Sequence, residues 1–131
     1  VRLATWDRDR LGYLNAAPRQ RYPGETISAG DVHVLSKALD PLPGGAEVYV
    51  NADGLSASSQ LRVEILDDRL RPMEGYSGAE SLPLQKSGFR RKVTFVGGSR
   101  LDGLNRPFRI RVNWEGSDQE YARLFAVYVV P

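Results

Sequence analysis

The sequence predicts an all-β fold: a two-sheet antiparallel β-sandwich, jelly-roll-like, with about eight or nine strands. Three observations carry this prediction. Apolar and polar residues alternate with a period of two in several segments. The 131 residues include 13 Gly and 8 Pro, which supply many turns. No segment repeats apolar residues at helical spacing over three turns. Strands with one buried face are typical of antiparallel sandwiches rather than of parallel sheets.

The first third of the chain has the shorter strand signals. A charged stretch, Asp7-Arg8-Asp9, separates two predicted strands, and a polar loop follows them. Pro41 to Gly45 is a strong turn signal. The strands expected before that turn are 1–6, 10–14, 26–27 and 32–36, and the polar loop is 16–24.

The rest of the chain alternates more regularly. Val48 and Val50 share one face of a strand and Tyr49 lies on the other, so we expect Tyr49 to be exposed. Between the later strands we expect a helical turn at 99–104 and a tight hairpin loop at 114–120. The strands predicted here are 46–52, 61–66, 91–96, 107–113 and 123–129.

Composition limits the class of protein. The length, the 41% hydrophobic content and the 26% charged content are typical of one globular domain, residues 1–131. Cysteine is absent, which excludes disulfides and thiolate metal sites. No apolar run reaches the length of a membrane span. The net charge of +2 and the short basic run Arg90-Arg91-Lys92 argue against nucleic acid as a partner.

Several segments together resemble a known module. It is the C-terminal β-sandwich that follows bladed catalytic domains in bacterial BNR-repeat, sialidase-like or family 32/43-like glycoside hydrolases and polysaccharide lyases. The opening segment Thr5 to Tyr13 is similar to the start of such modules. The other segments that carry the resemblance are 61–66, 71–72, 75–77, 83–84, 93–99, 101–104, 107–111 and 123–128.

The resemblance implies an accessory role. It implies that the domain is one segment of a longer protein, whose own catalytic domain is its first partner, and that the protein is secreted or periplasmic. The chain starts at Val1 rather than Met, which agrees with a segment of a longer protein. Polysaccharide is the second partner that the resemblance implies.

Aromatic residues flanked by polar residues are the candidate carbohydrate-binding residues. A sugar stacks its C–H face on an exposed ring, while nearby polar groups bind its hydroxyls. Trp114 continues the alternation of Phe108, Ile110 and Val112, so we predict that it lies in the core. Tyr76 lies in a loop, where it either binds sugar or plugs the end of the sandwich. The candidate carbohydrate-binding residues are Trp6, Arg8, Arg10, Tyr13, Tyr49 and Tyr76.

The sequence lacks the motifs of an enzyme. Glu74 and Glu80 share a loop and are the only carboxylates we consider as a glycosidase pair. His33 is the single histidine, which excludes a multi-histidine metal site, and we place it on a strand face. Asp53 and Asp67-Asp68 offer oxygen ligands for a structural calcium ion, but turn chemistry explains them better. We therefore expect no catalytic residue, metal or cofactor.

Three functions follow, in order of preference. The first is a non-catalytic module that binds glycan weakly, with anionic glycan preferred because the charge balance is slightly basic, especially at Arg8, Arg10 and Arg90. The second is a structural module that packs against a bladed catalytic domain. The third is a small glycan-cleaving enzyme. An exposed aromatic surface beside a shallow groove would favour the first function, and a large apolar patch the second.

Overall fold

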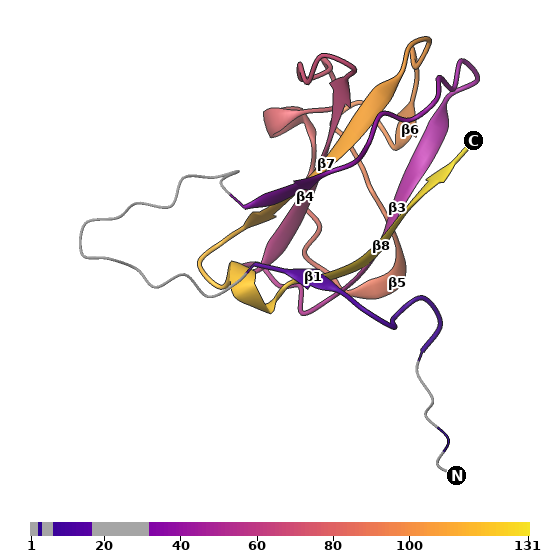
Figure 1. The fold of residues 1–131 in the computed structure, drawn as a ribbon. Helices are drawn as coiled ribbons and strands as arrows, with labels where there is room; N and C mark the ends of the chain where they lie inside the picture. Colours follow the sequence, from indigo (N-terminus) through magenta and orange to yellow (C-terminus); the bar gives the residue numbers. More distant parts are fainter. Residues whose placement is uncertain (1–2, 4–6, 17–31) are drawn as a thin grey trace.

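The computed structural model describes residues 3, 7–16 and 32–131. It confirms the predicted two-sheet antiparallel β-sandwich, with eight strands in the described residues (Figure 1). The strands are β1 (Leu14–Asn15), β2 (His33–Leu35), β3 (Ala46–Asp53), β4 (Gln60–Asp67), β5 (Gly88–Lys92), β6 (Arg100–Leu101), β7 (Phe108–Glu115) and β8 (Arg123–Val130). Two short 3-10 helices, η1 (Gly78–Glu80) and η2 (Gln119–Tyr121), lie in the connections.

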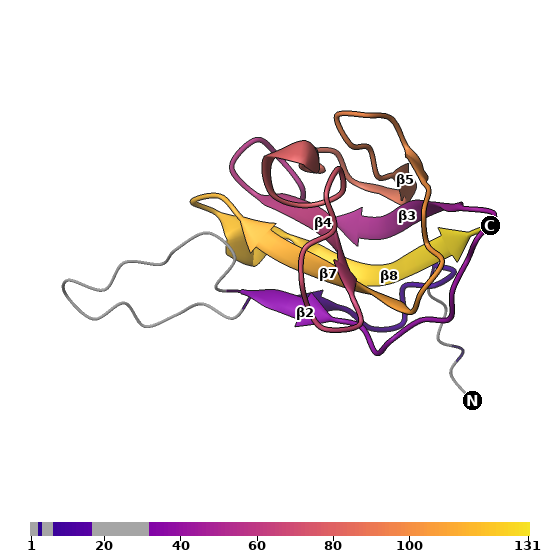
Figure 2. The same cartoon turned by 90° about the horizontal axis from the view of Figure 1, so that it is seen from above.

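The eight strands form two layers that pack face to face (Figures 1 and 2). Sheet A has the order β1-β8-β3-β5, with β6 also paired to β3, and sheet B has the order β2-β7-β4. All pairings are antiparallel. Most connections cross between the sheets, so strands that pair are distant in sequence, as β3 with β8 and β4 with β7.

The core lies between the sheets and follows the predicted alternation. Val48 and Val50 of β3 are fully buried opposite Val63 and Ile65 of β4. Trp114 is buried too, and its indole N–H donates to the Ala122 carbonyl at 3.0 Å. The prediction that Trp114 belongs to the core is confirmed. The other large buried apolar residues are Leu61, Val93, Phe95, Leu101, Leu104, Phe108, Ile110 and Val112.

Four predicted elements differ from the structure. The strand expected at 10–14 is limited to Leu14–Asn15, where it pairs with β8. The segment expected as a helical turn holds β6 instead, because Leu101 is buried beside Ala46 of β3. The loop after β7 is not a hairpin loop, because β7 and β8 belong to different sheets and η2 carries the chain across. The strand predicted at 91–96 lies earlier, at Gly88–Lys92. The strand signals at 1–6 and 26–27 and most of the 16–24 loop lie outside the described residues.

Candidate functional site

Four of the candidate carbohydrate-binding residues lie on or beside sheet A. Tyr49 points outward from β3, opposite the buried side chains of Val48 and Val50. Arg8 and Arg10 come from the segment before β1, and Tyr13 immediately precedes β1. The structure therefore brings Tyr49 to the same sheet as residues that lie 36 to 41 positions earlier in the chain.

Arg10 holds the N-terminal segment against sheet A. Its guanidinium carbon lies 4.0 Å from the centre of the Phe89 ring and 4.8 Å from that of Phe125. Its Nε donates to the Asn51 Oδ1 at 3.1 Å, and Asp53 lies 3.8 Å away. Only 15% of its side chain is exposed. These contacts occupy Arg10, which therefore supports the surface rather than offering donors to a ligand.

Two cationic side chains lie over the ring of Tyr49. The Arg90 guanidinium lies 4.6 Å and the Lys92 ammonium 5.5 Å from the centre of its ring. Its hydroxyl donates to Glu47 at 2.8 Å, and Lys92 donates to the other oxygen of Glu47 at 3.0 Å. These two hydrogen bonds, the first the stronger cause, hold the pKa of Glu47 below its ordinary value. Glu47 raises the pKa of Lys92 in return.

A shallow hollow of about 690 Å³ lies beside these residues, and we call it the sheet A hollow. Phe89 is its half-exposed ring, with 50% of its surface accessible. The Tyr128 hydroxyl donates to the Asp9 carboxylate at 2.8 Å across the hollow. Its lining combines one accessible aromatic ring with charged and amide groups, as carbohydrate sites do. The side chains that line it, apart from valines of β8, are Arg8, Asp9, Asn51, Phe89, Arg90 and Tyr128.

The charges around the hollow are unevenly paired. Arg10 lies 3.8 Å from Asp53, and Lys92 lies 3.0 Å from Glu47. The exposed Arg8 lies 3.8 Å from Asp9. Among the described residues, Arg90 has no carboxylate within ion-pair distance. Arg90 thus gives the hollow a cation that is not neutralised by a carboxylate of the described residues. An anionic group in the hollow would meet this charge.

Of the candidate residues, Tyr13 and Tyr76 do not line the hollow. Tyr13 is 52% exposed, stacks edge-on against Phe125 at 5.7 Å and lines a separate apolar cleft at the side of the sandwich. Tyr76 packs edge-on against Phe95 at 5.1 Å, and its hydroxyl accepts the Asp102 N–H at 3.0 Å. Tyr76 therefore plugs the end of the sandwich and is not part of the hollow. Trp6 lies outside the described residues.

The sequence analysis missed three aromatic residues of this surface: Phe89, Phe125 and Tyr128. Tyr128 is the cross-strand partner of Tyr49, and Phe125 lies at a register shift between β3 and β8. The alternation of β8 assigns Tyr128 to an outer face. The pairing of β3 with β8, which places it beside Tyr49, has no signal in the sequence.

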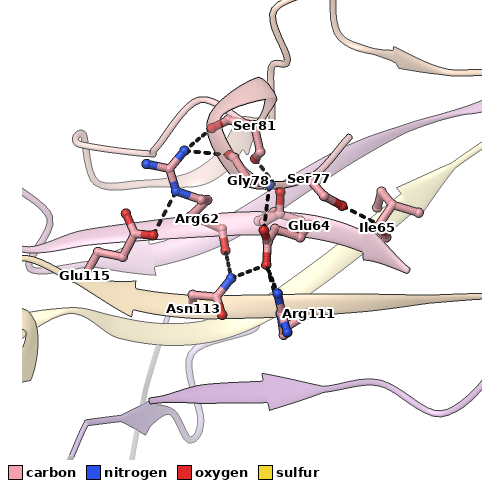
Figure 3. A network of polar contacts seen from close by, with 10 residues as sticks. Arg62, Glu64, Ile65, Ser77, Gly78, Ser81, Arg111, Asn113 and Glu115 are labelled. Carbon is pink, nitrogen blue, oxygen red and sulfur yellow. Dashed lines mark hydrogen bonds and ion pairs between the residues drawn. The ribbon is translucent and has the colours of Figure 1, made fainter. Parts of the chain in front are cut away.

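The outer face of sheet B carries a network of charged and amide side chains (Figure 3). Arg62 donates to Glu115 at 2.8 Å and to the carbonyl groups of Gly78 and Ser81. Glu64 accepts the Gly78 N–H at 2.7 Å and the Asn113 amide at 2.8 Å. These bonds fix the loop around η1 to the sheet.

Glu64 is the most buried carboxylate of this network, with 6% of its surface exposed. Arg111 donates to it from Nε at 2.8 Å and from Nη2 at 2.5 Å. Burial raises the pKa of Glu64, but the hydrogen bonds from Gly78, Arg111 and Asn113 outweigh burial and hold the pKa below its ordinary 4.5. A carboxylate held ionised by this many donors is a structural anion rather than a proton donor.

The carboxylates considered for catalysis or metal binding are in ordinary turns. Glu80 accepts the Gly75 N–H at 2.6 Å within its own loop. Asp67 accepts the N–H groups of Arg69 and Arg71, and Asp53 accepts that of Gly54. Within the described residues, no group of three or more His, Cys, Asp or Glu side chains could hold a metal ion. His33 lies on strand β2, as predicted.

Comparisons with protein-family models, with curated protein sequences and with solved structures find no match. Over the part of the chain that the structure describes, no helix has the length and apolar character needed to cross a membrane.

Proposed function

We propose that this domain is a non-catalytic accessory module of a carbohydrate-active protein that binds glycan weakly through the sheet A hollow. One observation carries the proposal: the hollow is lined both by the half-exposed Phe89 ring and by Arg90, which pairs with no carboxylate of the described chain. The ring gives a sugar's C–H face a platform, and Arg90 favours a carboxylate or sulfate over a neutral hydroxyl. The resemblance to accessory sandwiches of glycoside hydrolases and polysaccharide lyases supports the same function.

The shape of the hollow limits its affinity. It is open to water, so a bound sugar would keep much of its hydration, and exposed charge pairs would be screened over about 8 Å at physiological salt. We expect dissociation constants of roughly 10 μM to 1 mM for an anionic polysaccharide. Neutral glycans should bind more weakly, because they leave Arg90 without a counter-ion.

Affinity electrophoresis tests the proposal. We expect a polyuronate or a sulfated polysaccharide in the gel to retard the domain more than a neutral glucan, and rising salt to reduce the retardation. Phe89→Ala and Arg90→Ala should each weaken binding by about 5-fold or more. Tyr121→Ala and Arg106→Ala are matched controls, because both residues are exposed and lie outside the hollow. Thermal melts check that all four variants fold.

Two results would contradict the proposal. Retardation that Phe89→Ala and Arg90→Ala leave unchanged would place the binding site elsewhere. If no polysaccharide retards the domain, the alternative of a structural module that packs against a bladed catalytic domain is the one to keep.

A further inference from the structure

A second surface lies at the side of the sandwich, where the two sheets do not close. An apolar cleft of about 480 Å³ opens there between β1 and β8 of sheet A and β2 and β7 of sheet B. Val127 and Val129 of β8 lie on the inner face of sheet A but are only partly buried. Val34 and Leu39 line the cleft on the sheet B side. We call this the side cleft.

Strand β8 borders the side cleft with an unpaired edge. Strand β3 pairs with β8 along its length, whereas β1 pairs only with Arg123 and Leu124. Within the described residues, no backbone group pairs with the other edge of β8 from Phe125 to Val130. Unpaired N–H and C=O groups along a strand are a template for another strand.

The pairing of β3 with its neighbours shows which backbone N–H and C=O groups of β8 point to the free edge. The Val48 carbonyl accepts the Val93 N–H at 2.9 Å, so the backbone of Val48 faces β5 and not β8. Its partner on β8 is Val129, and the equivalent Val50 pairs with Val127. In an antiparallel sheet such pairs exchange no hydrogen bonds, so Val127 and Val129 direct their N–H and C=O groups to the free edge.

This edge lacks the features that protect edge strands. From Phe125 to Val130 there is no charged residue and no proline. Natural sheets protect a free edge with lysine, proline or an inward charge. An apolar edge of this length, above an apolar cleft, fits an extended polypeptide better than a small ligand, because only a polypeptide satisfies the backbone groups as well.

We infer that the edge pairs with a second copy of this chain, β8 against β8 in antiparallel orientation, centred on Tyr128. This register places Val127 opposite the partner's Val129 on the inner face. On the outer face it places Ala126 opposite the partner's Val130. Every cross-strand pair is apolar or aromatic, and each copy's valines cover the other copy's side cleft. The contact is self-complementary, as a two-fold interface requires.

Sedimentation velocity of the 131-residue chain over roughly 1 to 500 μM tests this inference. We expect a monomer–dimer equilibrium in the wild type. Val129→Pro removes one outward N–H without removing a bond to β3, and Val129→Lys places a charge toward the side cleft. Each should weaken dimerisation by about 10-fold or more. Val96→Lys, at an exposed site outside the cleft, is the matched control and should dimerise like the wild type.

The outcomes are distinct. A wild-type monomer at all concentrations would overturn the inference and assign the edge to a strand of a different polypeptide. A dimer that survives both Val129 variants would overturn it as well, because the interface would then lie on another face. Thermal melts of the variants separate loss of dimer from loss of fold. Val129 also lines the sheet A hollow, so glycan binding is measured in Phe89→Ala and Arg90→Ala and not in the Val129 variants.

Discussion

Glu64 is the residue on which the outer face of sheet B depends most. It accepts hydrogen bonds from the η1 loop through Gly78 and from the neighbouring strand through Arg111 and Asn113. One carboxylate thus joins a loop and two strands. Because its pKa in the folded protein is below its ordinary 4.5, the unfolded chain binds a proton at Glu64 more readily than the folded chain does.

We predict the effect of removing this charge. The contribution of Glu64 to stability is fully present above pH 4.5 and is lost as the pH falls through the lower pKa of the folded protein. Glu64→Gln should lower the free energy of unfolding at neutral pH by about 2 kcal/mol. Its further loss of stability on acidification should be smaller than that of the wild type. Urea denaturation at neutral pH and at about pH 3 measures both.

Glu74→Gln is the control, because Glu74 is exposed in its loop. Glu47 and Asp67 also have lowered pKa values, so part of the acid destabilisation remains in every variant. An equal acid-induced loss in the wild type and in Glu64→Gln would contradict the assignment of Glu64 as a structural anion.

Alternation predicted the inward residues well and the buried outward residues not at all. Val63 and Ile65 are fully buried, as the pattern requires. Asn51, Glu64 and Asn113 occupy outward positions and are buried nevertheless. Their cover comes from other parts of the chain, the Asp9–Arg10 segment and the η1 loop. Period-two patterns report a strand's own faces and contain no information on what packs over them.

At the scale of elements, two glycines fix the ends of the sandwich where strands change sheet. Gly116 has φ +101° after β7, and a Cβ there would lie 2.1 Å from the Ser58 carbonyl oxygen. Gly54 has φ +69° after β3, and a Cβ there would lie 1.9 Å from the Tyr121 carbonyl oxygen. Both positions combine a left-handed backbone with close approach of another chain segment, and only glycine fits them.

Gly116→Ala should therefore be strongly destabilising. The methyl group must displace backbone in the loop between β3 and β4, and alanine adds the cost of a positive φ, so we expect a loss of about 2 kcal/mol or more. Gly97→Ala is the matched control, because a Cβ there meets nothing within 4 Å and the φ is not positive. Its expected change is within about 0.5 kcal/mol. Thermal melts that rank the two variants equally would contradict this account of the turn.

The sequence could predict the elements that have their own pattern, but not those that form through contact with another segment. Strands β4, β7 and β8 lie within a residue or two of their expected bounds, since each has its own alternating pattern. The short β6 exists because Leu101 is buried against β3, which its own sequence does not indicate. The chain between β7 and β8 was wrongly predicted as a hairpin loop, because turn residues mark a reversal and not the sheet that the next strand joins.

For the whole molecule, we predict that the isolated domain has no glycan-cleaving activity. Glu64 is held ionised by its donors, and Glu80 is bonded within its own loop. The lowered pKa of Glu64 is the opposite of the raised pKa that a carboxylic acid needs in order to protonate a glycosidic oxygen. Incubation with anionic and neutral polysaccharides, with and without added divalent metal, should release no product. Turnover by the wild type that is lost in Glu74→Gln or Glu80→Gln would contradict this prediction and favour the alternative of a small glycan-cleaving enzyme.

The sequence predicted the candidate site only as a set of unplaced residues. Four predicted residues lie on or beside sheet A: Arg8, Arg10, Tyr13 and Tyr49. Phe89 and Tyr128 lie on the same sheet because β5 and β8 pair with β3, which is distant in the sequence. Tyr76 lies away from this group, where its ring packs against Phe95. The grouping depends on which strands are neighbours, and alternation does not determine neighbours.

The pairing of early strands with late strands also governs the order in which the domain can be built. Val48 and Val63 lie on strands whose partners, β8 and β7, are the last two strands of the described fold. Contacts this distant in sequence make folding slow, on a scale of roughly milliseconds to seconds. During synthesis one edge of β3 and one edge of β4 lack their strand partner until residues 108–130 have left the ribosome. A nascent chain of this domain therefore passes through a long stage in which neither sheet is complete and apolar strand surface is exposed.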